Sequence, residues 1–194
     1  MARHIEYDLS IVKKNLVSLF WAKGYAETSL ADLEAVSGLN RRQLYNGIGD
    51  KRAMFLQAMD AFSSNAGQQF LSPLEQEEAG LRDVANLFEA FLELAAADEH
   101  PLGCMVCSTS QDEISADKDV AKRIDSYFDR IRAAYANALY RANHRGELSL
   151  SPADQDLRVD MLFGTHVALC ILGRAGRPHD QLTRLATQAL ANLR

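Results

Sequence analysis

Apolar residues recur at helical spacing along most of the chain, and no stretch alternates apolar and polar residues for the length of a strand. Prolines at positions 73, 101, 152 and 178 separate these periodic stretches and suit the first turn of a new helix. The pattern predicts an all-α protein, with helices over residues 8–23, 29–37, 41–47, 51–70, 80–97, 102–115, 118–144, 154–174 and 178–193.

Residues 28–51 contain two of these helices, both short and joined at one glycine. Ser29 and Asp32 have the spacing of a capping box, which begins a helix. Gly38 can adopt the left-handed conformation that ends it, and Asn40 is a favourable N-cap for the next helix. This is the layout of a helix-turn-helix, a motif that places its second helix in the major groove of DNA.

The second of these helices is predicted to expose a polar, basic face. Arginine can bind guanine through two hydrogen bonds, glutamine and asparagine can bind adenine in the same way, and tyrosine can donate to a phosphate. The side chains on this face are Arg41, Arg42, Gln43, Tyr45 and Asn46. Ordinary solvation of a helix in an all-helical protein would give a similar face, so these residues alone leave both interpretations open.

A wider set of residues resembles the amino-terminal signature of the TetR family of transcriptional regulators: Phe20, Gly24-Tyr25, Thr28-Ser29, Gly38, Leu44-Tyr45 and Gly49-Asp50-Lys51. The resemblance covers about the first 55 residues. It implies a TetR-like fold, with a three-helix DNA-binding head over residues 1–55 and a helical body for effector binding and dimerisation over residues 56–194.

The resemblance also implies that double-stranded operator DNA is the partner. Tyr45 and Lys51 are then expected to contact phosphates. The groove-facing residues implied are Arg41, Arg42, Gln43 and Asn46, and Thr28, Ser29 and Asn40 complete the expected DNA-binding set.

Three positions depart from the family pattern. Ile48 stands where phenylalanine is usual, an exchange of apolar residues that should matter little. Gly47 stands where a DNA-contacting side chain is common. Glu34 stands where a small residue usually lets the two helices cross closely, and we expect its stem to bend outward and leave the carboxylate in water.

The charge of the chain is unevenly distributed. The net charge is −5 over 194 residues, yet residues 1–55 carry eight basic and six acidic side chains. A mildly basic head can bind phosphates if two copies present it together. No apolar run reaches the roughly 18 residues that span a bilayer, and the amino terminus lacks the apolar core of a signal peptide. We therefore expect a cytoplasmic protein with no membrane segment.

The segment from His100 to Cys107 is the other local feature with possible chemistry. If Pro101 opens a helix, Cys104 and Cys107 share one face, where a thiolate pair or a soft metal ion is conceivable. The chain lacks the α/β unit of a thioredoxin-like site and the second ligand pair of a structural zinc site. Buried cysteine usually packs as a small apolar residue. We expect packing, and keep redox, electrophile and metal sensing as alternatives.

His166 and Cys170 share a face of the apolar helix predicted over residues 154–174. Together with residues of other helices, His166 is expected to line a mostly apolar cavity for a small-molecule effector. The expected effector-binding set is Phe88, Phe91, Cys104, Met105, Tyr127, Phe128, Ile131, Phe163 and His166. Helix packing would also explain each of these residues, so the ligand is inferred mainly from the family resemblance.

The same helix is apolar around most of its circumference from Met161 onward, so it must be covered on more than one side. A second apolar stripe follows in the last predicted helix: Leu182, Leu185, Ala186, Ala189 and Leu190. The resemblance implies a homodimer formed through these two helices, in which Gly164, Ala168 and Gly173 would permit close approach.

Taken together, the sequence predicts a homodimeric repressor that binds a palindromic operator and is released by a small effector. No catalytic residues, cofactor or metal are expected. A thiol oxidoreductase based on Cys104 and Cys107 is the competing class, but no recognisable motif supplies a general base, a nucleotide-binding loop or a set of metal ligands.

Overall fold

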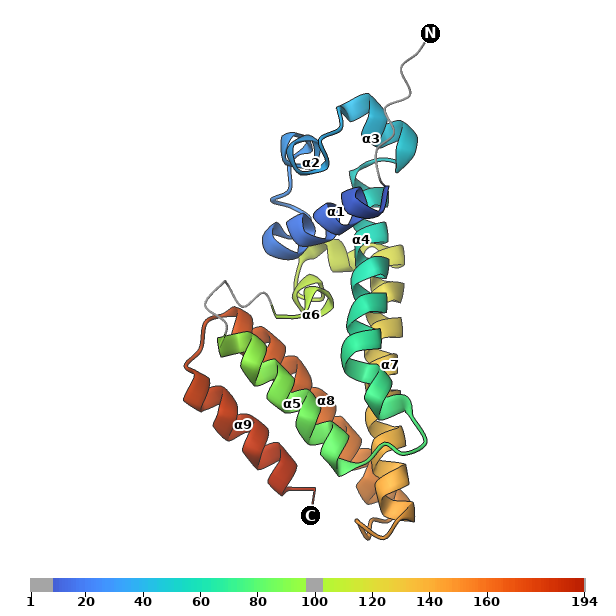
Figure 1. Cartoon of the computed structure of the whole chain (residues 1–194), viewed down its shortest axis with the longest axis vertical. Coiled ribbons are helices and arrows are strands. Elements are labelled where there is room, and N and C mark those ends of the chain that lie inside the picture. The colour runs from blue at the N-terminus through green and yellow to red at the C-terminus, as the bar shows by residue number, and fades with distance from the viewer. Residues whose placement is uncertain (1–8, 97–102, 194) are drawn as a thin grey trace.

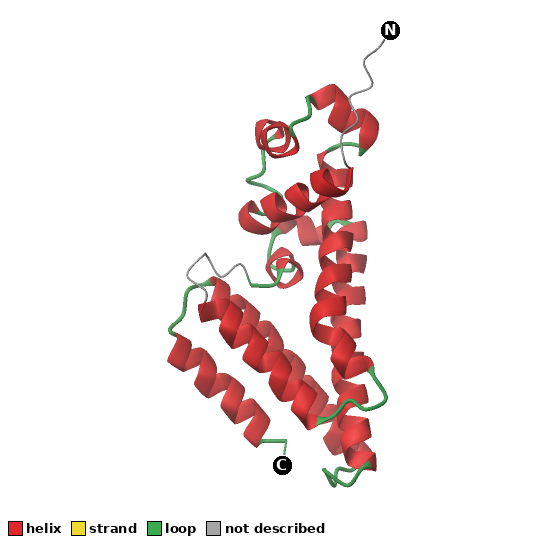
Figure 2. Ribbon diagram, viewed as in Figure 1, coloured by secondary structure: helices red, strands yellow, loops and turns green. Residues whose placement is uncertain are grey.

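The computed structural model describes residues 9–96 and 103–193 of the chain (Figure 1). Within these residues every regular element is helical, as Figure 2 shows. The α-helices are α1 (Leu9–Lys23), α2 (Leu30–Ser37), α3 (Arg41–Gly47), α4 (Lys51–Ala66), α5 (Leu81–Ala96), α6 (Met105–Thr109), α7 (Lys118–His144), α8 (Pro152–Arg174) and α9 (His179–Ala191). The prediction of an all-α fold is confirmed.

The helix predicted over residues 102–115 is wrong, because α6 spans only Met105–Thr109 and a 3-10 turn follows at Glu113–Ala116. Two side chains compete for the backbone acceptor that would extend it: the Ser110 hydroxyl and the Gln111 amide both donate to the Cys107 carbonyl oxygen. His100 and Pro101, which the prediction placed at the start of this helix, lie outside the described residues.

Helix α4 is packed against α1 on one side and α7 on the other (Figure 1). The helix predicted over residues 51–70 changes its winding before it ends, with a π-helical turn at Gly67–Leu71 and a 3-10 turn at Ser72–Glu75. The guanidinium of Arg130 lies where a side chain at Gly67 would stand, and it donates to Glu75. The absence of a Cβ at Gly67 therefore allows α7 to approach α4 closely.

Helices α5, α7, α8 and α9 form the rest of the body, and α8 packs against each of the other three. Its inward residues Val159, Leu162 and Leu169 are buried, whereas Leu157 and Met161 are exposed. The apolar stripe of α9 packs within its own chain, because Leu182, Ala186 and Ala189 are buried and Leu185 and Leu190 are half-buried. Among the described helices, none combines the length and apolar character needed to cross a bilayer.

Candidate DNA-reading surface and ligand cavity

Helices α2 and α3 meet at a turn whose predicted chemistry is present. The Ser29 hydroxyl accepts from the Asp32 N–H, and the Asp32 carboxylate accepts from the Ser29 N–H at 2.9 Å. Gly38 adopts φ +67°, the left-handed conformation that ends α2. Leu39 and Leu44 are buried on either side of the start of α3. These contacts fix the orientation of α3 relative to α2.

The N-terminus of α3 is capped from two directions. Asn40 accepts from the Gln43 N–H, and Gln43 accepts in return from the Asn40 N–H, each at 3.0 Å. The Glu34 carboxylate accepts from the Arg41 N–H at 2.5 Å. The expectation that Glu34 leaves its carboxylate in water is therefore wrong. The carboxylate reaches across the turn and accepts a hydrogen bond from a backbone N–H at the positive end of the α3 dipole.

The solvent side of α3 carries four exposed side chains, namely Arg41, Arg42, Tyr45 and Asn46. The Arg41 guanidinium lies over the Tyr45 ring, 5.4 Å from its centroid, which orders both residues. Gln43 is half-buried and its carbonyl oxygen is occupied by the cap.

The three remaining residues that were predicted to contact DNA near the turn differ in their exposure. Ser29 and Asn40 are exposed, and both act as N-caps. Thr28 is 1% exposed, and its hydroxyl donates to the Gly24 carbonyl oxygen at 2.7 Å. The Thr28 side chain therefore points into the head, and contact of this residue with DNA stays a prediction.

Lys51 is the first residue of α4, beside the α2–α3 unit. Its ammonium lies 4.5 Å from the centroid of the Tyr25 ring and donates to the Ala26 carbonyl oxygen at 3.4 Å. Asp50 caps α4 by accepting from the Ala53 N–H. The lysine is thus positioned at a helix N-terminus, a place where a phosphate is readily bound.

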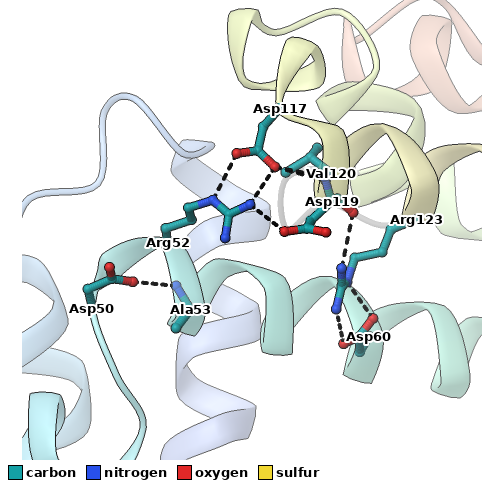
Figure 3. A network of polar contacts seen from close by, with 8 residues as sticks. All are labelled: Asp50, Arg52, Ala53, Asp60, Asp117, Asp119, Val120 and Arg123. Atoms are coloured by element: carbon teal, nitrogen blue, oxygen red, sulfur yellow. Dashed lines mark hydrogen bonds and ion pairs between the residues drawn. The ribbon is translucent and has the colours of Figure 1, made fainter.

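A charged network joins α4 to α7 (Figure 3). Arg52 donates to both Asp117 and Asp119 at the start of α7, and Arg123 of α7 donates back to Asp60 of α4. The guanidinium of Arg52 and the N–H groups that Asp117 caps hold the pKa of Asp117 low, at about 2. A rotation of α4 against α7 would have to separate these ion pairs.

A cavity of about 380 Å³ lies where the head meets the body. Residues of α1, α4, α5, α7 and α8 border it, together with Gly103 and Cys104 before α6. Four of the predicted effector-binding residues line it: Phe91, Cys104, Tyr127 and His166. The lining is mostly apolar, as in sites that bind small organic molecules.

The other five predicted effector residues do not line this cavity. Phe88, Met105 and Ile131 are completely buried in the core. Phe128 and Phe163 are half-buried and pack edge-to-face against each other, with ring centroids 5.4 Å apart. Their assignment to the cavity is wrong, because their helices turn them toward other neighbours.

The cavity also contains residues that the sequence did not single out, above all Trp21, Asn65 and Gln69. The indole N–H of Trp21 donates to the Gly103 carbonyl oxygen at 3.2 Å, and its ring packs edge-on against Phe62. Arg174 of α8 donates to the Trp21 carbonyl oxygen at 2.9 Å. Trp21 therefore joins the end of α1 to the body. The sequence signal for this contact is the single tryptophan of the chain, which lies near the end of the helix predicted over residues 8–23.

His166 is buried, and its Nδ1 lies 3.1 Å from the Tyr135 hydroxyl. Burial lowers the pKa of His166 to about 4, so the ring is neutral near pH 7. Within the described residues, no group of three or more His, Cys, Asp or Glu side chains is placed to bind a metal ion.

The chain is similar in sequence to two helix-turn-helix regulators and in fold to solved structures. No family model matches the chain. The chain is 24% identical, over 94% of its own length and of the relative's, to the uncharacterized HTH-type transcriptional regulator YezE of Bacillus subtilis. It is also 24% identical to the HTH-type transcriptional repressor ComR of Escherichia coli, over 73% of this chain and 68% of that protein.

Among solved structures, a triple cysteine mutant of the TetR family transcriptional regulator CifR, complexed with 26-bp double-strand operator DNA, superposes with a TM-score of 0.87. The match covers 100% of both chains at 19% sequence identity. The described helices thus have the arrangement found in that protein.

Proposed function

We propose that this chain, which has the fold of the TetR family of transcriptional regulators, binds operator DNA through α3 and regulates transcription. The observation that carries the proposal is α3 itself. It is capped by side chains, anchored by the buried Leu44, and exposes Arg41, Arg42, Tyr45 and Asn46 together. A short helix with this face fits the major groove and offers donors to base edges and phosphates. The operator complex of CifR supports this use of the fold.

The proposal includes a homodimer that reads a palindrome. The outer face of α8 exposes Leu157 and Met161, and a side chain at Gly164 would meet open space. A second copy that covers this apolar face would relate two α3 helices by a twofold axis, with half-sites separated by about one helical turn or slightly more. The outer surface of α9 is polar, and its apolar stripe packs within its own chain. We therefore expect α8 to contribute more of the interface than α9.

The proposal also assigns the cavity to a small effector that releases a repressor from DNA in the cytoplasm. The cavity is bordered on the head side by Val17 and Trp21 of α1. A molecule that fits better when α1 is displaced lowers DNA affinity by the difference between its binding energies in the two states. Trp21 donates a hydrogen bond to Gly103 and accepts one from Arg174. A molecule that fills the cavity therefore acts directly on the contacts that attach the head to the body.

Selection from a random DNA library with the purified protein tests the proposal. We expect one enriched palindromic motif, whose binding weakens steeply as salt is raised. The matched control is a variant with Arg41, Arg42 and Asn46 replaced by alanine, which leaves Leu44 and the caps in place. Enrichment of no motif by the unmodified protein, or of the same motif by the variant, would contradict the assignment of α3.

A further inference from the structure

Three buried cysteines meet beside the cavity, and DNA binding makes no use of them. Cys104 is the residue before α6, Cys107 lies one turn further along, and Cys170 comes from α8. The side chains of Cys107 and Cys170 lie next to that of Cys104. Cys104 and Cys170 border the cavity, whereas Cys107 is 1% exposed behind them. Cys104 therefore faces the cavity with two thiols at its sulfur.

The contacts among the thiols decide which of them ionises. Burial opposes ionisation of Cys104, but hydrogen bonds from Cys107 and Cys170 outweigh it and lower the pKa of Cys104 well below its ordinary value. The charge on Cys104 raises the pKa of Cys107 and of Cys170 in turn. The cluster thus favours ionisation of Cys104 over that of its two neighbours, and the thiolate is the nucleophilic form of cysteine.

The surroundings of that sulfur suit an organic molecule with a carbonyl group. Phe91 and Leu169 supply an apolar wall, while Asn65 of α4 and Gln69 of the π-helical turn that follows supply exposed amide donors. Tyr127 borders the cavity together with Cys104. A compound with a short apolar chain and a conjugated carbonyl can place its chain against the wall and its oxygen near one of these donors.

We propose that Cys104 is a covalent sensor that adds to the β-carbon of a small α,β-unsaturated carbonyl compound held in the cavity. The regulatory part of this inference rests on the proposed function. In the addition, the sulfur of the thiolate forms a bond to the β-carbon, and the electron pair of the carbon–carbon double bond moves onto the carbonyl as an enolate. The α-carbon then takes a proton from water, which balances the proton that Cys104 released on ionising. The step needs no oxidant or reductant.

The adduct affects DNA binding through the residue next to Cys104. The Gly103 carbonyl oxygen accepts from Trp21, and Gly103 has φ +60° with the Cys170 carbonyl oxygen where a Cβ would stand. This segment has no room to shift toward α8. A carbon chain attached to Cys104 must therefore occupy the space in front of Trp21, where it displaces the end of α1 and with it the head.

The test uses the full-length protein and trans-2-hexenal as the probe, added in equimolar amount to total protein. Intact mass and peptide mapping should show one added aldehyde per chain, located on Cys104. The Cys104→Ser variant should lose the adduct. The Cys107→Ser variant is the matched control, since it removes a thiol from the same cluster that does not face the cavity. It should still carry the adduct on Cys104, because the serine hydroxyl retains a hydrogen-bond donor at this position.

The second readout is affinity for the duplex that the unmodified protein selects. The adduct should weaken binding by about tenfold or more, a typical allosteric coupling, while the aldehyde should leave Cys104→Ser unaffected. No adduct, an adduct located first on Cys170, loss of two hydrogens as a disulfide, or an adduct on Cys104 that leaves affinity unchanged would each overturn the inference. Failure to select any duplex would instead refute the proposed function, and the peptide map would still decide whether Cys104 is the reacting thiol.

Discussion

Arg52 donates two hydrogen bonds to Asp117, each 2.8 Å long, and so ties the first turn of α4 to the start of α7. Asp117 also caps α7, by accepting from the N–H groups of Asp119 and Val120. One carboxylate therefore serves both the helix it begins and the contact between the N-terminal end of α4 and the body.

Asp117→Asn separates these two roles, because asparagine retains the cap and loses the charge. The lowered pKa of Asp117 means that its ion pair stabilises the fold fully above about pH 4, the ordinary value being 3.8, and that this contribution is lost as the pH falls toward 2. We expect the variant to unfold at lower temperature than the unmodified protein at pH 7, with the difference shrinking between pH 4 and pH 2. Thermal unfolding followed by circular dichroism measures this, and a difference independent of pH would contradict it.

Arg42 and Lys51 should affect DNA binding in different ways. Arg42→Ala should cost about 1–3 kcal/mol at one base position and relax the sequence preference there. Lys51→Ala should weaken all sequences alike and reduce the salt dependence, since a phosphate contact carries no sequence information. Arg82→Ala, which removes an exposed charge from α5, is the control and should change neither quantity. Competition binding with single-base variants of the selected duplex distinguishes the two effects.

Glu34 places a negative charge beside the proposed DNA-reading face of α3 while it accepts from the Arg41 N–H. Glu34→Gln retains an acceptor and removes the charge, so it should strengthen binding to all DNA sequences alike. Glu34→Ala removes the acceptor too and should cost about 0.5–2 kcal/mol of stability, as the loss of a helix cap does. Filter binding at two salt concentrations, together with urea unfolding, tests both statements. Weaker DNA binding by the glutamine variant would show that the carboxylate itself contacts DNA.

Leu157 and Met161 test the proposed interface better than residues of α9 do, because both are exposed within one chain. Leu157→Glu and Met161→Glu should leave the monomer folded and place unpaired charges between the two copies. Light scattering should then give the mass of one chain at micromolar concentration, against two for the unmodified protein. Ile11→Glu, at an equally exposed apolar position on α1, should remain dimeric.

The buried pair of Tyr135 and His166 predicts a second dependence on pH. Because His166 titrates near 6.5 when exposed and at about 4 when folded, protons favour the unfolded chain, and stability should decline as the pH falls from about 6.5 to 4. His166→Gln should flatten that part of the profile. Tyr135→Phe should cost about 1–3 kcal/mol at pH 7 by leaving the His166 Nδ1 unpaired. Urea unfolding at several pH values measures each quantity.

The parts of the structure that could be predicted from sequence are those fixed by neighbouring residues. Ser29, Gly38 and Asn40 act within three or four positions of themselves, so their spacing was enough to locate α2 and α3. The cavity depends instead on the rotation of each helix about its axis. That rotation is set by long-range packing, which turned Phe88 inward to the core and Phe163 toward Phe128.

The contribution of Trp21 illustrates the same limit. Its partners Gly103 and Arg174 lie 82 and 153 positions away in the chain. No periodic pattern relates residues at such separations. The meeting of Cys170 with Cys104 has the same origin, since the cysteine spacing indicated only the local pair of Cys104 and Cys107.

The chain contains one tryptophan, and it is the residue between the cavity and the head. Indole emission depends on the polarity around the ring and on nearby quenching groups. The unlabelled protein therefore has an intrinsic fluorescent probe at the cavity. A compound that enters the cavity should change the emission of Trp21, and no second tryptophan contributes to the signal. A fluorescence screen of candidate molecules can begin before any operator is known.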